Sequence, residues 1–229
     1  MRVFATLCFL VSIASTTQAN PRPFIATYSA NIDLLIDVPA TATRTLNRTD
    51  SDTWQFESHA SAIFAKQTER SELRLTETGW SPVRYRYDRT LLGRARSIAI
   101  EFDKNAQRVT TIAKGEPWVQ PWEAGVQDRL SYQLQLRNDL ANQKESLDYR
   151  IADGGQIKHY RFKRLGEEQL TTQAGTFTCE RLQLERQGQQ HTTLLWMAKS
   201  LDYLTVRLIR IDADGKEHIL NLKSLEFLD

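Results

Sequence analysis

Residues 173–186 read QAGTFTCERLQLER, residues 192–197 read TTLLWM, residues 202–211 read DYLTVRLIRI and residues 217–228 read EHILNLKSLEFL. These runs are rich in Leu, Ile, Val, Thr and aromatic residues, and polar segments that contain glycine separate them. Runs of this composition, punctuated in this way, are typical of an antiparallel meander. The stretch holds no catalytic motif, so it predicts a fold and leaves the chemistry open.

The apolar phase slips inside the first of these runs. Phe177 and Cys179 fall on odd positions, whereas Leu182 and Leu184 fall on even ones. Successive side chains of a strand point to opposite faces, so one extra residue moves the apolar set to the other face. We therefore expect a β-bulge near Glu180.

Alternation continues through the N-terminal half of the chain. From Trp54 to Phe64, apolar or small residues alternate with mostly polar ones, which predicts a strand over residues 54–65. Residues 114–128 contain two prolines and two glycines and are expected to form a loop. Further strands are expected at residues 24–36, 41–47, 69–77, 80–87, 98–102, 108–113, 146–151 and 156–165.

Residues 128–140 fit two patterns. Alternation of Leu130, Tyr132 and Leu134 fits a strand, whereas the spacing of Leu130, Leu134 and Leu140 fits a helix with Asp128 as its N-cap. The segment lacks β-branched residues, which favours the helix. The chain is thus predicted to be all-β, with a single large curved antiparallel sheet or half-open barrel and one helix. No linker divides residues 20–229, which we expect to form a single domain.

The N-terminus has the pattern of a secretory signal peptide. Arg2 precedes an apolar run over residues 3–13, and Thr17-Gln18-Ala19 forms a small-residue cleavage site. The run is too short to span a bilayer. Cys8 lies too early for a lipoprotein cleavage box, so we expect a periplasmic chain without a lipid anchor or an integral membrane segment.

The mature chain is nearly neutral, because the 30 basic residues less Arg2 stand against 28 acidic ones. We therefore expect no nucleic-acid partner. Cys179 is left without a second cysteine and is expected to be buried and inert.

Metal and cofactor motifs are missing from the sequence. The four histidines are too scattered for metal-ligand spacing, and residues 212–215 (DADG) fit a hairpin turn better than a calcium loop. We expect no metal or other cofactor. The histidines are His59, His159, His191 and His218.

Two features could bind a ligand. Arg84 and Arg86 are part of a basic patch that could grip phosphates or carboxylates, unless neighbouring acidic residues neutralise it. Trp118 and Trp122 each lie beside a proline and could cover a cavity or plug the open end of the core. The rest of the patch is Arg89, Arg94 and Arg96, interleaved with Tyr85 and Tyr87, and the neutralising candidates are Glu69, Glu72, Asp88 and Glu101.

The chain resembles a family of bacterial envelope proteins known as the domain of unknown function 3108. The resemblance rests on Tyr28 and on motifs over residues 69–72 (ERSE), 81–85 (SPVRY), 128–131 (DRLS), 174–177 (AGTF), 195–196 (LW) and 203–207 (YLTVR). Gln173 and Thr205 stand where the family tends to have proline. The resemblance implies a periplasmic protein built on a large curved antiparallel sheet, and it carries over no active site.

The leading hypothesis is a non-enzymatic binding protein that holds a lipid or other apolar envelope molecule on the concave face of the sheet. Trp54, Phe56, Ala60 and Phe64 would line that face, the Trp118 and Trp122 loop would border the cavity, and Arg84 and Arg86 would meet a head group. The alternatives are an assembly factor that docks another envelope protein, and a hydrolase with an unrecognised site.

We predict that the mature protein begins at Asn20 and is released from cells by osmotic shock. The intact mass of the purified protein measures this directly. A species that retains residues 1–19, or one that carries acyl chains, would contradict the prediction.

Overall fold

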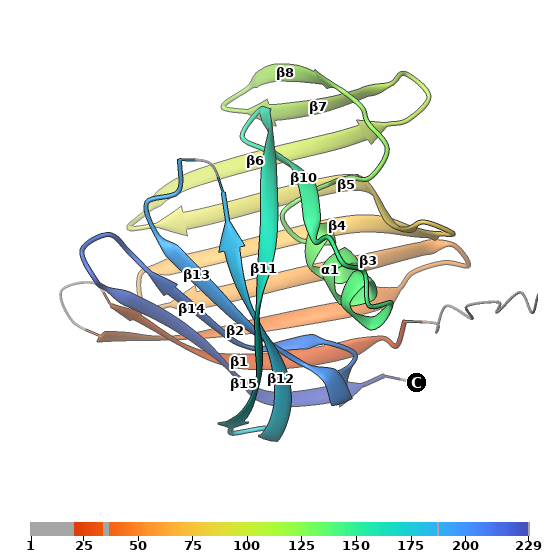
Figure 1. The fold of residues 1–229 in the computed structure, drawn as a ribbon. Coiled ribbons are helices and arrows are strands. Elements are labelled where there is room, and N and C mark those ends of the chain that lie inside the picture. Colours follow the sequence, from red (N-terminus) through yellow and green to blue (C-terminus); the bar gives the residue numbers. More distant parts are fainter. Residues whose placement is uncertain (1–20, 34–36, 187, 229) are drawn as a thin grey trace, which may run out of the picture.

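The computed structural model describes residues 21–33, 37–186 and 188–228, so the predicted signal peptide lies outside the described residues. Fifteen strands form one mixed sheet, whose curvature encloses the helix α1 (Ser131–Ala141) (Figure 1). The N-terminal strands are β1 (Phe24–Asp33), β2 (Asp37–Arg48), β3 (Thr53–Ala62), β4 (Ala65–Thr76), β5 (Gly79–Leu91), β6 (Arg94–Asp103), β7 (Arg108–Ala113) and β8 (Glu116–Pro121). The C-terminal strands are β9 (Val126–Gln127), β10 (Asp148–Asp153), β11 (Gln156–Thr172), β12 (Gly175–Glu185), β13 (Thr192–Ala198), β14 (Leu204–Ile211) and β15 (Glu217–Phe227).

The sheet consists of two meanders joined by the pairing of β1 with β15. β8 and β9 are its two ends, and the sheet does not close into a barrel. β9 pairs with β10 in the parallel direction, while the other paired strands run antiparallel. The all-β prediction with one helix is confirmed. No helix among the described residues is long and apolar enough to cross a membrane.

The register places one continuous row of side chains on the inner face of the first meander. Cross-strand partners share a face, so this row can be read directly from the pairing. It runs through Phe24, Leu46, Phe56, Ser71, Tyr85 and Ile100, and all six are buried.

The predicted loop over residues 114–128 is wrong in part, because it contains β8 and β9. Pro117 and Pro121 suggested a break, since proline cannot donate to a strand ladder. β8 is an edge strand and pairs only with β7, so the missing N–H groups are tolerated there.

The predicted bulge near Glu180 is displaced onto the neighbouring strand. β12 pairs with β13 without interruption, whereas the β11 register shifts between Arg164 and Glu167, opposite Arg181. The change of apolar phase in β12 has a different cause: Cys179 packs in one apolar cluster, and Leu182 packs in another. Both faces of this strand therefore contribute to a core.

Helix α1 belongs to both clusters. Leu130, which precedes the helix, and Leu134 pack in the larger cluster with the N-terminal strands, while Leu136 and Leu140 pack in the smaller cluster with β10 to β13. The helix thus fills the space inside the curved sheet and links its two halves. The other buried members of the smaller cluster are Leu147, Tyr149, Ile151, Tyr160, Phe162, Leu182, Leu184, Leu195 and Met197.

The N-cap residue of α1 is Leu130, two residues later than predicted, but the Asp128 side chain still binds the free N–H groups at the helix start. Its Oδ1 accepts the N–H groups of Leu130 and Ser131 at 2.7 and 2.8 Å, and the Ser131 hydroxyl accepts the N–H of Asp128 at 2.7 Å. This reciprocal arrangement satisfies donors that a helix start leaves free. Ser71 of β4 donates to Asp128 Oδ2, so the cap also ties the helix to the sheet.

We predict that Asp128→Asn raises the free energy of unfolding at pH 7 and flattens its pH dependence between about pH 4 and 6. Burial raises the pKa of the Asp128 carboxyl to about 6. The folded protein therefore binds this proton more tightly than the unfolded chain, and stability falls as pH rises through that window. A shift of about two units corresponds to roughly 3 kcal/mol. The amide keeps the oxygen that accepts the two backbone N–H groups.

Urea unfolding from pH 4 to 7 measures the effect. Asp128→Ala is the control: it also removes the titrating carboxyl, so its stability should be equally flat with pH, and we expect it to lie about 1–2 kcal/mol below that of Asp128→Asn at every pH because the cap is gone. A larger loss for Asp128→Asn at pH 7 than at pH 4 would contradict the assignment.

Candidate functional site

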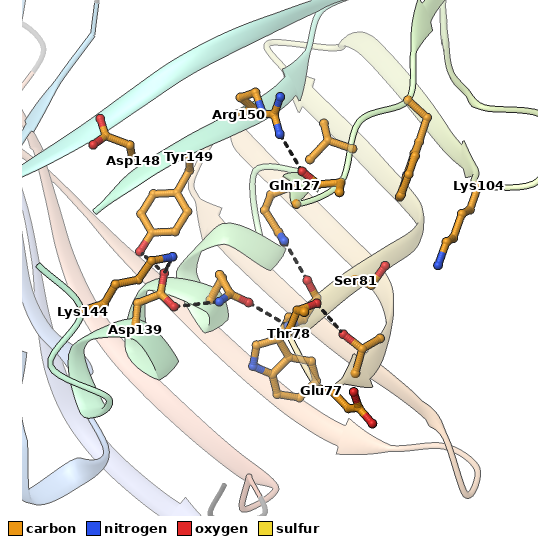
Figure 2. Close-up of a pocket in the computed structure, with 17 residues that line it drawn as sticks. Glu77, Thr78, Ser81, Lys104, Gln127, Asp139, Lys144, Asp148, Tyr149 and Arg150 are labelled. Carbon is orange, nitrogen blue, oxygen red and sulfur yellow. Dashed lines mark hydrogen bonds and ion pairs between the residues drawn. The ribbon is translucent and has the colours of Figure 1, made fainter. Parts of the chain in front are cut away.

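A pocket of about 740 Å³ lies beside the gap between the two ends of the sheet. Its walls come from the β4–β5 turn, the β6–β7 turn, the β8–β9 connection, α1 and β10 (Figure 2). It is lined by Thr76, Glu77, Thr78, Trp80, Ser81, Lys104, Trp122, Ala124, Gly125, Val126, Gln127, Gln135, Asp139, Lys144, Asp148, Tyr149 and Arg150.

Two glutamines take the place of a missing strand beside Trp80. β6 pairs with β5 only from Arg84 onward, so the backbone of Trp80 has no strand neighbour on that side. Gln135 Oε1 accepts the Trp80 N–H at 2.7 Å, and Gln127 Nε2 donates to the Trp80 carbonyl oxygen at 2.7 Å. Buried backbone groups must be paired, so these side chains complete the edge of β5.

Gly79 gives Gln135 room to reach this edge. Its φ is +111°, and an added Cβ would lie 2.2 Å from Gln135 Oε1. Both the backbone conformation and the close approach require glycine here.

Asp139 is the centre of a second buried network in the pocket wall. Its carboxylate accepts hydrogen bonds from Gln135 Nε2 at 2.8 Å and from the Tyr149 hydroxyl at 2.9 Å, and Lys144 Nζ lies 3.3 Å away. Figure 2 shows these groups converging on one side of the pocket. Burial, and then the Asp139 charge, raise the pKa of Tyr149, so the phenol keeps the proton that it donates. The Asp139 side chain thus holds three neighbouring side chains together in the pocket wall.

Two tryptophans give the pocket an apolar wall. Trp80 is buried and packs edge-on against Trp54, with ring centroids 5.6 Å apart. Trp122 is partly buried against the core, and Lys104 Nζ lies 5.9 Å from its ring centroid. In Figure 2 Lys104 lies across the pocket from Lys144 and Asp139.

One buried hydrogen-bond acceptor in the pocket wall has no partner in the described part of the chain. Gln127 Oε1 is shielded from solvent and has no hydrogen-bond partner among the residues described. A buried polar atom without a partner costs free energy, and this oxygen, being shielded from solvent, lies behind the surface that a bound molecule would meet.

The residues predicted for the concave face separate into two groups. Trp54 and Phe56 are buried in the larger cluster, and Ala60 packs against it. Phe64 is wrongly assigned to this face, because β3 ends at Ala62 and the Phe64 side chain is 69% exposed in the turn that follows. None of these four residues lines the pocket.

Trp118 and Trp122 differ in their positions and contacts. Trp118 lies on β8, where its ring would be 3.0 Å from a Cβ on Gly155, and the neighbouring Gln120 donates to the Gly155 carbonyl at 3.1 Å. It therefore covers the β10–β11 turn and bridges the gap between the sheet ends. Only Trp122 lines the pocket.

Arg84 and Arg86 lie on the outer face of β5, away from both the pocket and the buried tyrosines. Arg84 pairs with Glu72 at 3.3 Å, and Arg86 pairs with Asp88 at 2.7 Å. Neutralisation by neighbouring carboxylates therefore holds for these two arginines. Since side chains alternate along a strand, Arg89 shares the opposite face with Tyr87.

A polar cluster lies on the inner face, above Tyr85 and Tyr87. Glu69 accepts hydrogen bonds from Tyr85 and from Gln67, and Arg129 Nε lies 3.9 Å from its Oε2. The Arg129 guanidinium also lies 5.5 Å from the Tyr87 ring centroid. Glu69 thus faces the interior instead of neutralising the outer arginines.

The remaining candidates for chemistry are Cys179 and a metal site. Cys179 is buried, and burial raises the pKa of its thiol to about 11, so the thiolate is disfavoured. Where side chains are described, no group of three His, Cys, Asp or Glu residues could hold a metal ion.

Gln127, Gln135, Asp139 and Tyr149 were missed as site residues by the sequence reasoning. Gln135 and Asp139 lie four residues apart on α1, one turn of a helix, so they share a face. A signal was therefore present in the sequence. It could be used only with the knowledge that this polar face is buried.

We predict that Gln135→Leu lowers the free energy of unfolding by about 1–3 kcal/mol, because it leaves the buried N–H of Trp80 and one oxygen of Asp139 without a donor–acceptor partner. Gln133→Leu is the matched control on the same helix, since Gln133 donates only to its own helix at Arg129 O. Urea unfolding measures both. Equal losses in the two variants would show that Gln135 does not hold the edge of β5.

The fold is similar to that of a β-barrel-like protein of the domain of unknown function DUF1849 from Brucella abortus. The TM-score is 0.61 at 7% sequence identity, with 91% of this chain and 98% of that chain covered. A protein with a YmcC-like fold from Bacteroides fragilis matches with a TM-score of 0.37 at 8% identity, covering 90% and 97% of the two chains. At 7% identity the likeness to the Brucella abortus protein shows the fold alone.

No curated protein matches this chain. Residues 27–220 match the family described as "Protein of unknown function (DUF3108)", which is the family that the sequence motifs indicated. This match spans most of the strands and the whole of the pocket. The chain therefore belongs to the DUF3108 family.

Proposed function

We propose that this chain is a non-enzymatic periplasmic protein that binds a lipid-like amphiphile in the pocket beside the sheet gap. The observation that carries the proposal is the composition of the pocket wall, in which Trp80 and Trp122 face a space of about 740 Å³ that is rimmed by charged residues. Small-molecule sites span about 300–1,000 Å³. This pocket lies in that range, and its apolar part is concentrated at the two tryptophans, because eleven of the seventeen lining residues are polar or charged. The periplasmic location rests on the secretory pattern of residues 1–19.

The pocket lining carries three cations and three carboxylates, so a preference for an acidic ligand rests on the local position of Lys104 and not on the net charge. Lys144 pairs with Asp139, and Arg150 pairs with Glu123, which lies outside the pocket lining. Among the described residues, no carboxylate forms an ion pair with Lys104, and its ammonium lies beside Trp122. A carboxylate at Lys104 would therefore place an attached acyl chain along the tryptophan wall.

The polar groups that converge in the pocket support binding rather than catalysis. Asp139 is surrounded by three donors, and the phenol of Tyr149 keeps its proton. A general base needs an acceptor position directed at the substrate, and three of the roughly four acceptor positions of this carboxylate are occupied by protein donors. The apolar wall supplies the driving force, since ten buried methylenes contribute roughly 8 kcal/mol before association costs.

We predict saturable binding of a fluorescent fatty acid to the delipidated protein, with a dissociation constant on the order of micromolar. Ser81→Trp should abolish binding by filling the pocket. Lys104→Gln should weaken it about tenfold, because a charge-assisted hydrogen bond is worth roughly 1.5–3 kcal/mol. Quenching of the fluorescence of the pocket tryptophans gives a second readout.

Two further tryptophan variants locate the site. Ser224→Trp, on an exposed part of β15, controls for the added side chain and should bind as the wild type does. Ala60→Trp tests the concave face instead, because Ala60 packs against the main core and not in the pocket. Loss of binding in Ala60→Trp with retention in Ser81→Trp would move the site to the concave face. No saturable binding by the wild type would remove the proposal.

A further inference from the structure

Two neighbouring hairpin tips carry four exposed apolar side chains. Ile63 and Phe64 form the β3–β4 turn and are 74% and 69% exposed, while Leu91 and Leu92 at the β5–β6 turn are 39% and 73% exposed. We call these four residues the tip patch. Single exposed apolar residues are common, whereas a contiguous apolar group is a candidate interaction surface.

The backbone holds the two tips side by side. The Leu92 N–H donates to the Phe64 carbonyl oxygen at 3.0 Å, and Ala65 pairs with Leu91 at the end of the β4–β5 ladder. Figure 1 shows β3, β4, β5 and β6 running next to one another, so their turns share one margin of the sheet. The tip patch is therefore a single surface on a firm support.

Leu92 has a left-handed backbone conformation, which leucine disfavours. Its φ is 48° and that of Gly93 is 76°, so both central residues of this two-residue turn are left-handed. Such turns favour Asn-Gly or Asp-Gly, and a left-handed leucine costs about 1–2 kcal/mol. Leucine at this position displays an apolar side chain at the apex of the turn, where the fold alone would favour asparagine.

The tip patch is surrounded by positive charge. Residues 61–67 and 89–97 include four basic residues and no acidic one. All four are exposed, and within the described chain no carboxylate forms an ion pair with any of them. They are Lys66, Arg89, Arg94 and Arg96. This contrasts with Arg84 and Arg86 on the same sheet, which are both paired.

We propose that the tip patch docks the protein on an anionic lipid bilayer. The four apolar side chains enter the boundary between head groups and acyl chains, and the four cations contact the lipid phosphates. Peripheral binding of this kind draws on buried apolar area together with attraction to anionic lipid. Each basic residue near such a surface contributes about 1 kcal/mol.

The charge distribution favours a lipid surface over a second copy of this chain. Two tip patches brought together would oppose four cations to four cations, whereas a bilayer offers a dense plane of phosphates. The docking surface is also separate from the pocket, since the two lie at opposite ends of the β4–β5 pair, about 36 Å apart at 3.3 Å per residue. The inference therefore does not rest on the proposed function.

Co-sedimentation with vesicles tests the proposal. The wild-type mature protein should bind vesicles of equimolar phosphatidylglycerol and phosphatidylcholine, and should bind phosphatidylcholine vesicles at least about tenfold more weakly. Leu92→Asn combined with Phe64→Ser should reduce binding to the anionic vesicles about tenfold or more. Leu92→Asn relieves the strained turn, and urea unfolding of the double variant checks that lost binding does not come from lost folding.

Matched controls use the same changes elsewhere on the sheet. Ile112→Ser with Val119→Ser removes two exposed apolar side chains from β7 and β8, and should leave vesicle binding unchanged. Arg94→Glu with Arg96→Glu should abolish the preference for anionic vesicles, whereas Arg84→Glu with Arg86→Glu on the outer face should not.

Three results would overturn the proposal. They are no vesicle binding by the wild type, equal binding by the tip-patch and control variants, and a concentration-dependent dimer in analytical ultracentrifugation that Phe64→Ser dissolves. The last result would identify a second copy of the chain as the occupant.

Discussion

The fold depends on hydrogen-bond partners for the backbone N–H and carbonyl groups of Trp80, which lie at an open edge of the sheet. β5 extends beyond β6 at its N-terminal end, so the N–H and carbonyl of Trp80 face a gap in the sheet. A sheet that does not close has to satisfy such groups by other means. Gln135 from α1 and Gln127 from β9 do so, and they thereby fix the helix and the last strand against β5.

The pocket is a consequence of this solution. A strand in the same place would pack along the whole edge, whereas two side chains reach the backbone at single points and leave space beside them. That space is lined on one side by the groups around Asp139 and on the other by Lys104 and Trp122. The same residues that stabilise the open sheet therefore shape the site, and a binding site of this kind needs no loop of its own.

The sequence was informative wherever one periodicity dominated. It predicted the meander, the helix and the capping role of Asp128, because period-two alternation and a cap residue are local signals. β8 was hidden by Pro117 and Pro121, whose cost disappears at an edge strand. Phe64 was in phase with Trp54 but lay beyond the strand end, and phase alone does not reveal where a strand stops. Gln127, Gln135 and Asp139 acquire their roles only from the long-range contact between α1 and β5.

The arginines of β5 and β6 are close in sequence but have two different environments, because alternate side chains of a strand point to opposite faces of the sheet. Arg84 and Arg86 alternate with the buried Tyr85 and Tyr87, so they point outward, where Arg84 pairs with Glu72 of β4 and Arg86 pairs with Asp88 of its own strand. Arg89, two positions beyond Tyr87, points to the other face, near the hairpin tips where the segments carry no acidic residue. A basic cluster that looks uniform in the sequence is therefore neutral along the strands and unpaired at their ends. The unpaired part coincides with Phe64 and Leu92, the side chains that the core leaves in solvent. Because the pocket lies at the far end of the same strands, the sheet separates two surfaces of different chemistry on one rigid support.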